Sequence, residues 1–104
     1  MKALVTGATG FIGSRLTERL IASGWKVNVL VRSRQKLKHS IKNTCTIFDG
    51  DLSDFNKIKK ASEEVDIIFN VAAALPHHKL VEKAYWDANV LGVKNILRAC
   101  RENN

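Results

Sequence analysis

Cysteine, proline and tyrosine are scarce in this sequence, and long apolar runs are absent. The two cysteines, Cys45 and Cys100, form no CxxC pair and belong to no cluster spaced like metal ligands. We therefore expect two reduced, buried thiols in a cytoplasmic protein, and no disulfide framework. No apolar run approaches the roughly 20 residues of a membrane span, and the N-terminus lacks a signal-peptide pattern. A membrane partner is therefore not expected.

Acidic residues are also few, and this sets the charge. Ten Asp and Glu stand against 17 Lys and Arg, which gives a formal net charge of +7. A basic balance favours an anionic partner such as a nucleotide or a nucleic acid. The basic residues are scattered, however, without the interleaved aromatics of a single-strand platform. We therefore favour no nucleic-acid partner, while an alternative DNA-binding domain predicts strongly salt-dependent binding that ignores the glycines.

Strand-like and helix-like segments alternate along the chain. The β-branched, apolar runs predict four strands, at Lys2–Thr6, Lys26–Val31, Cys45–Phe48 and Asp66–Val71. The first helix is predicted at Phe11–Ser23, and a loop with a short helix is predicted at Arg32–Ser40. A further helix is predicted from a cap at Ser53 or Asp54 to about Ser62, and a last one from beyond Pro76 to the end of the sequence. This order predicts one α/β domain over residues 1–104, a doubly wound parallel sheet with strand order 3-2-1-4.

The helical periodicity also predicts which side chains face the sheet. In the first helix we expect a buried stripe with Thr17 on an outer face, and in the last helix a single buried face. The first stripe is Ile12, Leu16 and Leu20, and the second face is Asn89, Val93, Ile96 and Cys100, supported by Val90 and Leu97.

The stretch TGATGFIG, Thr6 to Gly13, joins the first strand to the first helix. Its glycines have the spacing GxxGxxG. Gly7 permits a tight turn, Gly10 lets backbone N–H groups approach a pyrophosphate, and Gly13 lets the helix lie close to the sheet. The helix N-terminus adds unpaired donors and partial positive charge. The alternative is a tight strand–helix turn that holds no ligand.

Four segments in order resemble the extended short-chain dehydrogenase/reductases, which include the NAD-dependent epimerase/dehydratases and dihydroflavonol-reductase-like enzymes. They are TGATGFIG, then DGDL at Asp49–Leu52, NVAA at Asn70–Ala73 and NVLGVKN at Asn89–Asn95. The resemblance implies a Rossmann-like domain that binds NAD(P). The expected cofactor-binding residues are Gly7, Thr9, Gly10, Phe11, Ile12, Arg32, Asp51, Leu52, Ala72, Ala73 and Ala74. Asn70 replaces the usual histidine, and Asn89 is expected to be a structural polar residue near the cofactor.

The end of the second strand predicts which dinucleotide is bound. Sites that prefer NAD place an acid there for the ribose 2′-hydroxyl, but no carboxylate lies between Val27 and Phe48. Arg32 can instead meet a 2′-phosphate, helped by Arg34 or Lys36, so we predict NADP with NAD as the alternative. The other interpretation of Arg32 is a solvated loop residue. Asp51 is expected beside the adenine amine, or as a helix cap, with Leu52 on the ring.

The catalytic pair of the family is missing. The resemblance implies a YxxxK pair, but the tyrosine here is Tyr85 and residue 89 is asparagine. We therefore assign no catalytic residue and expect an inactive N-terminal fragment of a larger oxidoreductase or epimerase, acting on a sugar nucleotide or ketone-type small molecule. The alternative is a non-catalytic, NADP-binding redox regulator. The apolar fourth strand is an open edge, through which the chain is expected to self-associate.

A metal site is not expected. His77 and His78 are adjacent, but no carboxylate or cysteine accompanies them in a ligand pattern. We interpret them as solvated loop residues.

Overall fold

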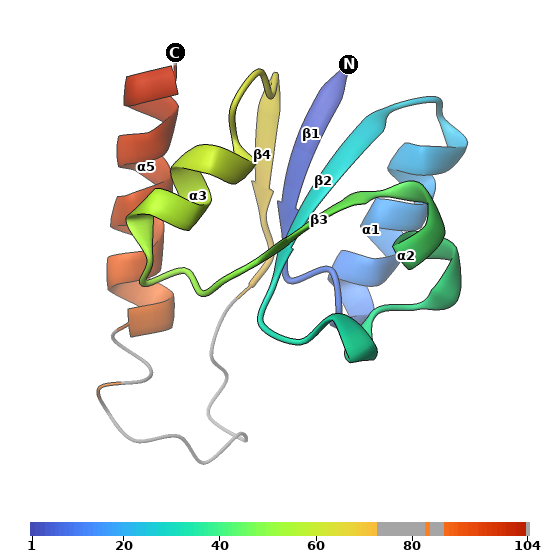
Figure 1. Ribbon diagram of the computed structural model, residues 1–104, viewed down its shortest axis with the longest axis horizontal. Coiled ribbons are helices and arrows are strands. Elements are labelled where there is room, and N and C mark those ends of the chain that lie inside the picture. The colour runs from blue at the N-terminus through green and yellow to red at the C-terminus, as the bar shows by residue number, and fades with distance from the viewer. Residues whose placement is uncertain (73–82, 84–86, 104) are drawn as a thin grey trace.

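Four parallel strands form the centre of the fold, in the order β3-β2-β1-β4 (Figure 1). The computed structural model describes residues 1–72, 83 and 87–103. The strands are β1 (Lys2–Thr6), β2 (Lys26–Val31), β3 (Thr46–Asp49) and β4 (Ile67–Asn70). The predicted α/β class and the predicted strand order are therefore confirmed. All four carboxyl ends lie at one edge of the sheet, because every pairing is parallel.

The central strands are buried on both faces, as their unbroken apolar runs predict. Ala3, Leu4 and Val5 of β1 have no exposed surface. The one polar side chain inside β2, Asn28, is also buried, and its Nδ2 donates to the carbonyl oxygen of Ala61 at 2.9 Å. A buried amide is tolerated there because its donor is satisfied.

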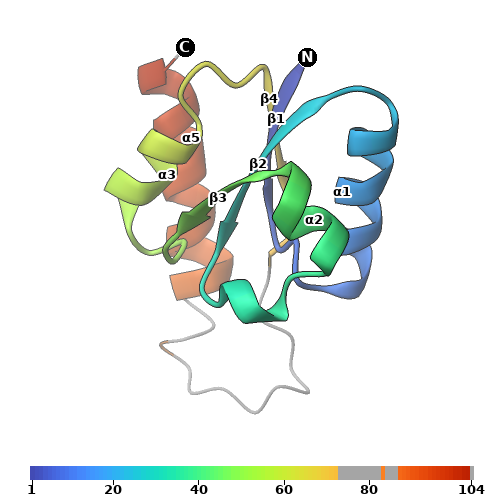
Figure 2. The ribbon, with the colours of Figure 1, turned by 45° about the vertical axis from the view of Figure 1, so that its right-hand side comes forward.

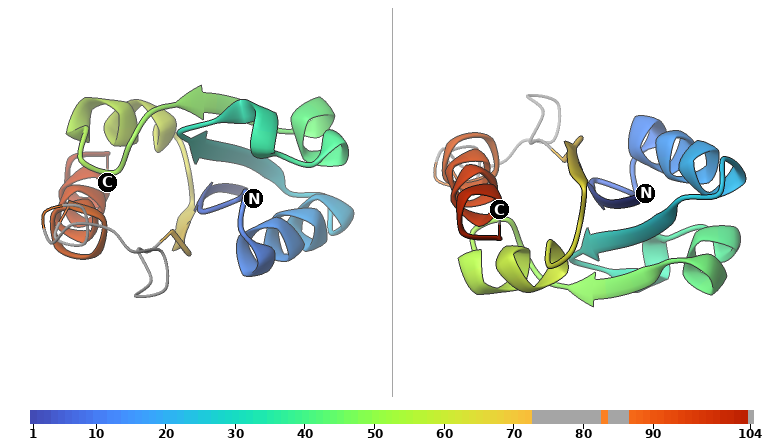
Figure 3. Two further views of the ribbon diagram at one scale, coloured as in Figure 1. Left: turned by 90° about the horizontal axis from the view of Figure 1, so that it is seen from below. Right: turned by 90° about the horizontal axis from the view of Figure 1, so that it is seen from above.

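Helices cover both faces of the sheet (Figure 2). Helices α1 (Phe11–Ala22) and α2 (His39–Thr44) lie on one face, and α3 (Phe55–Ala61) and α5 (Gly92–Asn103) lie on the other. Figure 3 shows α1 and α5 on opposite sides of β1 and β4. A 3₁₀ turn, η1 (Arg34–Lys36), precedes α2, and a π-helical turn, η3 (Asp87–Leu91), leads into α5. No helix of the described part is long and apolar enough to span a membrane.

Local capping explains two helix ends. The α1 helix stops before Gly24, whose φ of +87° is a left-handed conformation that glycine adopts at little cost. Helix α3 begins after Asp54, whose carboxylate accepts a hydrogen bond from the N–H of Lys57 at 3.4 Å. Of the two predicted caps, Asp54 is therefore the one that the structure uses.

The predicted buried stripe of α1 is wrong at two positions. Ile12 is exposed, whereas Thr17, expected on an outer face, has no exposed surface. The hydroxyl of Thr17 donates to the carbonyl oxygen of Gly13 at 2.7 Å, so the helix itself satisfies this polar group. Burial of a threonine at a helix–sheet contact then costs little.

The predicted buried face of α5 is confirmed at Ile96 and wrong at Val93 and Cys100. The structure buries Gly92, Asn95, Ile96 and Ala99, while Val93, Leu97 and Cys100 are exposed. Ile96 and Ala99 pack in one core cluster with Ile58 and Ala61 of α3, and the Asn95 amide donates to the carbonyl oxygen of Leu52 at 2.8 Å. The expectation of two buried thiols also fails, because Cys45 is only half-buried.

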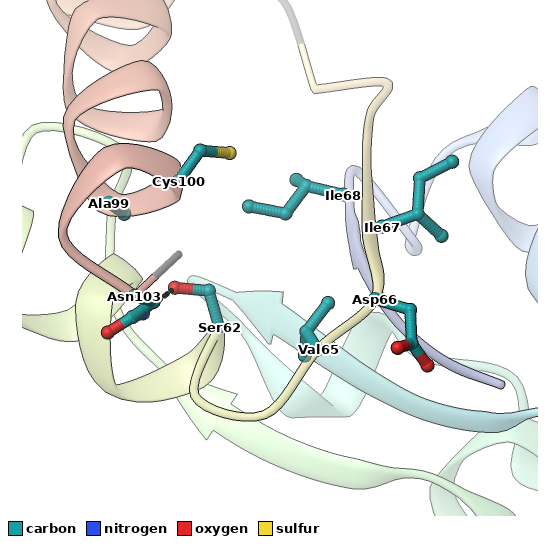
Figure 4. Close-up of a pocket in the computed structure, with 8 residues that line it drawn as sticks. All are labelled: Ser62, Val65, Asp66, Ile67, Ile68, Ala99, Cys100 and Asn103. Carbon is teal, nitrogen blue, oxygen red and sulfur yellow. Dashed lines mark hydrogen bonds between the residues drawn. The ribbon is translucent and has the colours of Figure 1, made fainter.

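The outer edge of β4 is open, as predicted, since β4 pairs only with β1 among the described strands. A cavity of about 240 Å³ lies between this strand and α5. Figure 4 shows Ile68 pointing from β4 towards Cys100 of α5, while Ile67 points to the other side of the strand. Apolar side chains at an unpaired edge favour association with another strand.

Candidate functional site

The glycine turn joins the carboxyl end of β1 to α1. The N–H of Gly10 donates to the carbonyl oxygen of Gly7 at 3.1 Å and closes the turn. Gly7 has a φ of +80°, and a Cβ there would lie 2.6 Å from the backbone nitrogen of Ala72. A Cβ on Gly13 would lie 1.9 Å from the carbonyl oxygen of Gly7. Gly7 and Gly13 are therefore required by the fold itself.

Gly10 has a different role. It is exposed and extended, with φ −83° and ψ 172°. The atom nearest to a Cβ placed there would be the Gly7 oxygen, at 3.4 Å, which is an ordinary van der Waals contact. The protein thus leaves open space above Gly10, where a glycine lets a ligand approach the backbone. Thr9, Phe11 and Ile12 are exposed around it, with Phe11 74% and Ile12 67% exposed.

The N-terminus of α1 is suited to an anion. Gly10 provides no side-chain cap, and the first turn contains no acidic residue. The first N–H groups of a helix have no partner within the helix, and the helix dipole adds partial positive charge there. The guanidinium of Arg15 lies 4.7 Å from the centre of the Phe11 ring, which brings a further cation near this end.

A hydrogen-bond network ties β1 to β4 beside the turn. The Thr6 hydroxyl donates to Oδ1 of Asn70 at 2.6 Å and accepts from the N–H of Ala72 at 3.3 Å. This holds the backbone of Ala72 against Gly7, at the point where the crossovers from β1 diverge to opposite faces. The sequence interpretation gave no role to Thr6 or Asn70. Their contact could have been predicted from the polar residue that ends each of these two neighbouring strands.

Arg32 and Asp51 lie near each other beyond the ends of β2 and β3. Arg32 Nη1 is 4.0 Å from Asp51 Oδ2, and the side chains are 82% and 47% exposed. The other carboxylate oxygen of Asp51 accepts from the N–H of Ser53 at 3.0 Å and from its hydroxyl at 3.2 Å. Asp51 thus stabilises a turn and does not cap α3. Arg32 is held loosely and is open to an incoming anion.

A second arginine–carboxylate pair lies beside the first. Nε and Nη2 of Arg34 hold the Asp49 carboxylate in a fork, with the closest contact, Nη2 to Oδ2, at 2.7 Å. This hydrogen bonding lowers the pKa of Asp49 and raises the pKa of Arg34. Sequence reasoning considered Arg34 as a helper but gave Asp49 no role. A role for Asp49 could have been predicted from its position at the end of β3, beside the end of β2.

Leu52 lies deeper than expected. It is only 8% exposed and belongs to the core formed by Leu4, Leu30 and Ile58. Its carbonyl oxygen accepts the hydrogen bond from Asn95. Only a narrow strip of the Leu52 side chain is available to an adenine ring. Asn89 lies in η3 with an exposed side chain.

Several predicted residues lie outside the described part of the chain. These are Ala73, Ala74, His77, His78 and Tyr85. Within residues 1–72, 83 and 87–103, no three His, Cys, Asp or Glu side chains gather as metal ligands.

The described residues therefore converge on the carboxyl edge of the sheet. A glycine turn and a helix N-terminus follow β1, an arginine follows β2, a carboxylate follows β3 and Ala72 follows β4. A parallel sheet of order 3-2-1-4 with a glycine-rich first turn defines a Rossmann-type dinucleotide-binding domain.

Comparison with known proteins identifies the family. A sequence profile described as "NAD dependent epimerase/dehydratase family" matches residues 3–104. The chain belongs to this family, and its fold is the family's nicotinamide-dinucleotide-binding unit.

Two curated relatives have reductase names. The 2-alkyl-3-oxoalkanoate reductase of Shewanella oneidensis is 35% identical over 99 residues, which are 95% of this chain and 25% of that protein. A 4-hydroxy-2-methyl-3-oxo-4-farnesyl-3,4-dihydroquinoline-1-oxide ketoreductase of Stigmatella aurantiaca is 31% identical over 102 residues, 98% of this chain and 30% of that protein.

A solved structure agrees in fold. The UDP-glucose 4-epimerase of Thermus thermophilus, in complex with NAD, superposes with a TM-score of 0.79 at 32% identity, over 99% of this chain and 34% of that one. The chain thus spans between a quarter and about a third of the length of these similar proteins.

Proposed function

We propose that this chain binds NADP(H) and forms the cofactor-binding part of an oxidoreductase or epimerase. The observation that carries the choice of NADP is at the end of β2, where an exposed arginine, Arg32, stands in place of an acid. An acid at this position accepts hydrogen bonds from a ribose 2′-hydroxyl and repels a 2′-phosphate, whereas an arginine attracts the phosphate.

The remaining contacts follow from the arrangement of the edge. The open space above Gly10 and the uncapped start of α1, with Thr9, Phe11 and Ile12, fit the pyrophosphate. Gly7 fits this cradle indirectly, because it lets the turn lie against Ala72. The bound dinucleotide supplies the hydride acceptor or donor of the reaction.

The adenosine end lies between β2 and β3. A 2′-phosphate can displace Asp51 from Arg32, because their 4.0 Å separation is too long for a hydrogen bond. The carboxylate of Asp51 is then available to the exocyclic amine of adenine, beside the exposed strip of Leu52. Ala72, with Ala73 and Ala74, provides small side chains for the neighbouring ribose.

Isothermal titration calorimetry with NADPH and NADH tests this proposal. We expect tighter binding of NADPH, because it adds a charged hydrogen bond to Arg32. Replacing Arg32→Ala should weaken NADPH binding by roughly 10- to 100-fold, the effect of losing a hydrogen bond to a charged group. NADH binding should not change. Arg101→Ala, an exposed arginine of α5, is the control and should leave both affinities unchanged.

Two results would contradict parts of the proposal. Failure of the unaltered chain to bind either cofactor refutes dinucleotide binding by these residues. Tighter binding of NADH than NADPH refutes the role of Arg32 while leaving the glycine turn in place.

For the whole protein we propose a small-molecule substrate of ketone or sugar-nucleotide type and a cytoplasmic location. The names of the two relatives support a ketone, and the name of the similar structure supports a sugar nucleotide. No observation favours the redox-regulator alternative. Assaying a protein that extends this chain to the relatives' length for NADPH oxidation with 3-oxo acids, and for epimerisation of UDP-glucose, distinguishes the two substrate classes.

A further inference from the structure

We propose that Asp49 is a positioning residue for the 2′-phosphate: its fork with Arg34 fixes the loop 32–36, which carries Arg32. The inference deepens the proposed function and rests on it. It assigns the preference for NADP to a pair of residues in addition to the arginine that contacts the phosphate.

The loop is anchored at both of its ends. Val31, at the end of β2, is 4% exposed, and Leu37, directly after η1, is 5% exposed. Between these buried residues only Ser33 is partly buried, and the rest are exposed. The internal backbone bonds are few, from Lys36 N–H to Ser33 at 3.3 Å and from Leu37 N–H to Arg34 at 3.1 Å. The hydrogen bonds of such a 3₁₀ turn have poor geometry, so a further contact helps to hold one conformation.

Asp49 is suited to supply that contact because it is fixed to the sheet. It pairs in register with Val31, and the N–H of the next residue, Gly50, donates to the Val31 carbonyl oxygen at 3.0 Å. Its carboxylate therefore starts from a rigid strand end and reaches the middle of the loop. Three contacts of 2.7 to 3.1 Å join it to Arg34. A bidentate fork fixes direction as well as distance.

The fork leaves part of Arg34 for an anion. All three contacts use Nε and Nη2, so Nη1 can approach a phosphate without breaking the fork. Arg32, by contrast, is 4.0 Å from its carboxylate neighbour. The fork thus fixes Arg34 and the backbone of the loop, while the exposed side chain of Arg32 stays available to the phosphate.

Simple electrostatics predicts the opposite effect of removing Asp49. A carboxylate near a 2′-phosphate repels it, so loss of this charge alone should strengthen NADPH binding. Loss of a positioning contact should weaken it. The sign of the change in NADPH affinity on Asp49→Asn therefore separates a positioning residue from a mere neighbouring charge.

The experiment compares Asp49→Asn with Glu102→Gln. Glu102 of α5 is the control, since it is also a surface carboxylate bound by an arginine, Arg98 at 2.8 Å, and it lies 3.2 Å from Lys59 of α3. By calorimetry we expect Asp49→Asn to weaken NADPH binding about threefold, within the range of exposed ion pairs. NADH binding should not change, and the control should change neither affinity.

Amide hydrogen exchange provides a readout that needs no cofactor. Asp49→Asn should speed exchange at the amides of Lys36 and Leu37, which close η1, by about threefold. Unchanged exchange, or NADPH affinity that is unchanged or improved, would overturn the inference. If the unaltered chain binds neither cofactor, the proposed function fails, and exchange alone then decides whether Asp49 fixes the loop.

Discussion

Two glycines of the same turn should respond differently to the same substitution, Gly→Ala. At Gly10 an added Cβ meets nothing closer than 3.4 Å, whereas at Gly13 it would lie 1.9 Å from the carbonyl oxygen of Gly7 and 2.6 Å from the carbonyl carbon. Gly10→Ala should therefore fold normally but bind the cofactor more weakly. Gly13→Ala should lose stability as well.

The magnitudes follow from the geometry. Gly10 already has φ −83°, which alanine adopts freely. Alanine is a poorer N-cap than glycine, which destabilises the folded state by about 0.5 to 1 kcal/mol. Alanine also reduces the conformational entropy of the unfolded chain, which stabilises the folded state by about the same free energy. The melting temperature should therefore change by less than about 4 °C. At Gly13 the turn must move by about 1 Å, and such overpacking costs about 3 kcal/mol, or about 12 °C or more in a domain of this size.

Circular dichroism melts combined with NADPH titration separate the two effects. We expect Gly10→Ala to melt like the unaltered chain and to bind NADPH at least about tenfold more weakly, because the methyl group stands between the backbone and the pyrophosphate. Undiminished binding by a folded Gly10→Ala chain would refute the view that ligand approach explains this glycine. A Gly13→Ala chain of full stability would refute the packing argument.

Three further predictions concern thiols, acid stability and association. Burial raises the pKa of Cys45 to about 11, so iodoacetamide at pH 8 should modify exposed Cys100 first; mass spectrometry showing Cys45 modified first contradicts this. Hydrogen bonds from arginines lower the pKa values of Asp49 and Glu102, so their stabilisation is present above about pH 4 and is lost as pH falls through the lowered values. The thermal unfolding midpoint of the double variant Asp49→Asn/Glu102→Gln should therefore lie below that of the unaltered chain at pH 6 and approach it at pH 2. A difference between the two midpoints that does not change with pH rejects this explanation. On gel filtration Ile67→Lys, which places a charge in the open-edge strand β4, should shift an associated chain towards monomer, and a monomeric unaltered chain rules out edge association.

The sequence predicts those parts of the fold that depend on local pattern. The β-branched runs at Lys26–Val31 and Ile67–Asn70 are strands, and parallel crossovers then leave few possible orders. The glycine turn is also predictable, because backbone conformation at Gly7 and close approach at Gly13 demand glycine. The turn itself suggests a pyrophosphate, and the likeness to a known family extends this to a nicotinamide dinucleotide.

The features that the sequence did not predict depend on how segments far apart in the chain are aligned with one another. Thr6 and Asn70 are 64 residues apart, and they meet because both end neighbouring strands in register. The buried face of α5 was misassigned in part because hydrophobicity alone favoured Val93 over Gly92, whereas the structure buries Gly92 and exposes Val93. Helix periodicity specifies a stripe, but the shape of the opposing surface selects which stripe is buried.

The two arginines at the adenosine end differ in how firmly each is held, and this difference bears on selectivity. Each arginine has a neighbouring carboxylate, so the positive charge of both arginines is already partly balanced. Arg34 has three hydrogen bonds to its partner, while Arg32 is 4.0 Å from Asp51, which is engaged with Ser53. A phosphate gains most from the arginine whose existing contact is weakest, because little must be broken to bind it. On this reasoning Arg32 makes the phosphate contact, and the fork at Arg34 keeps it in place.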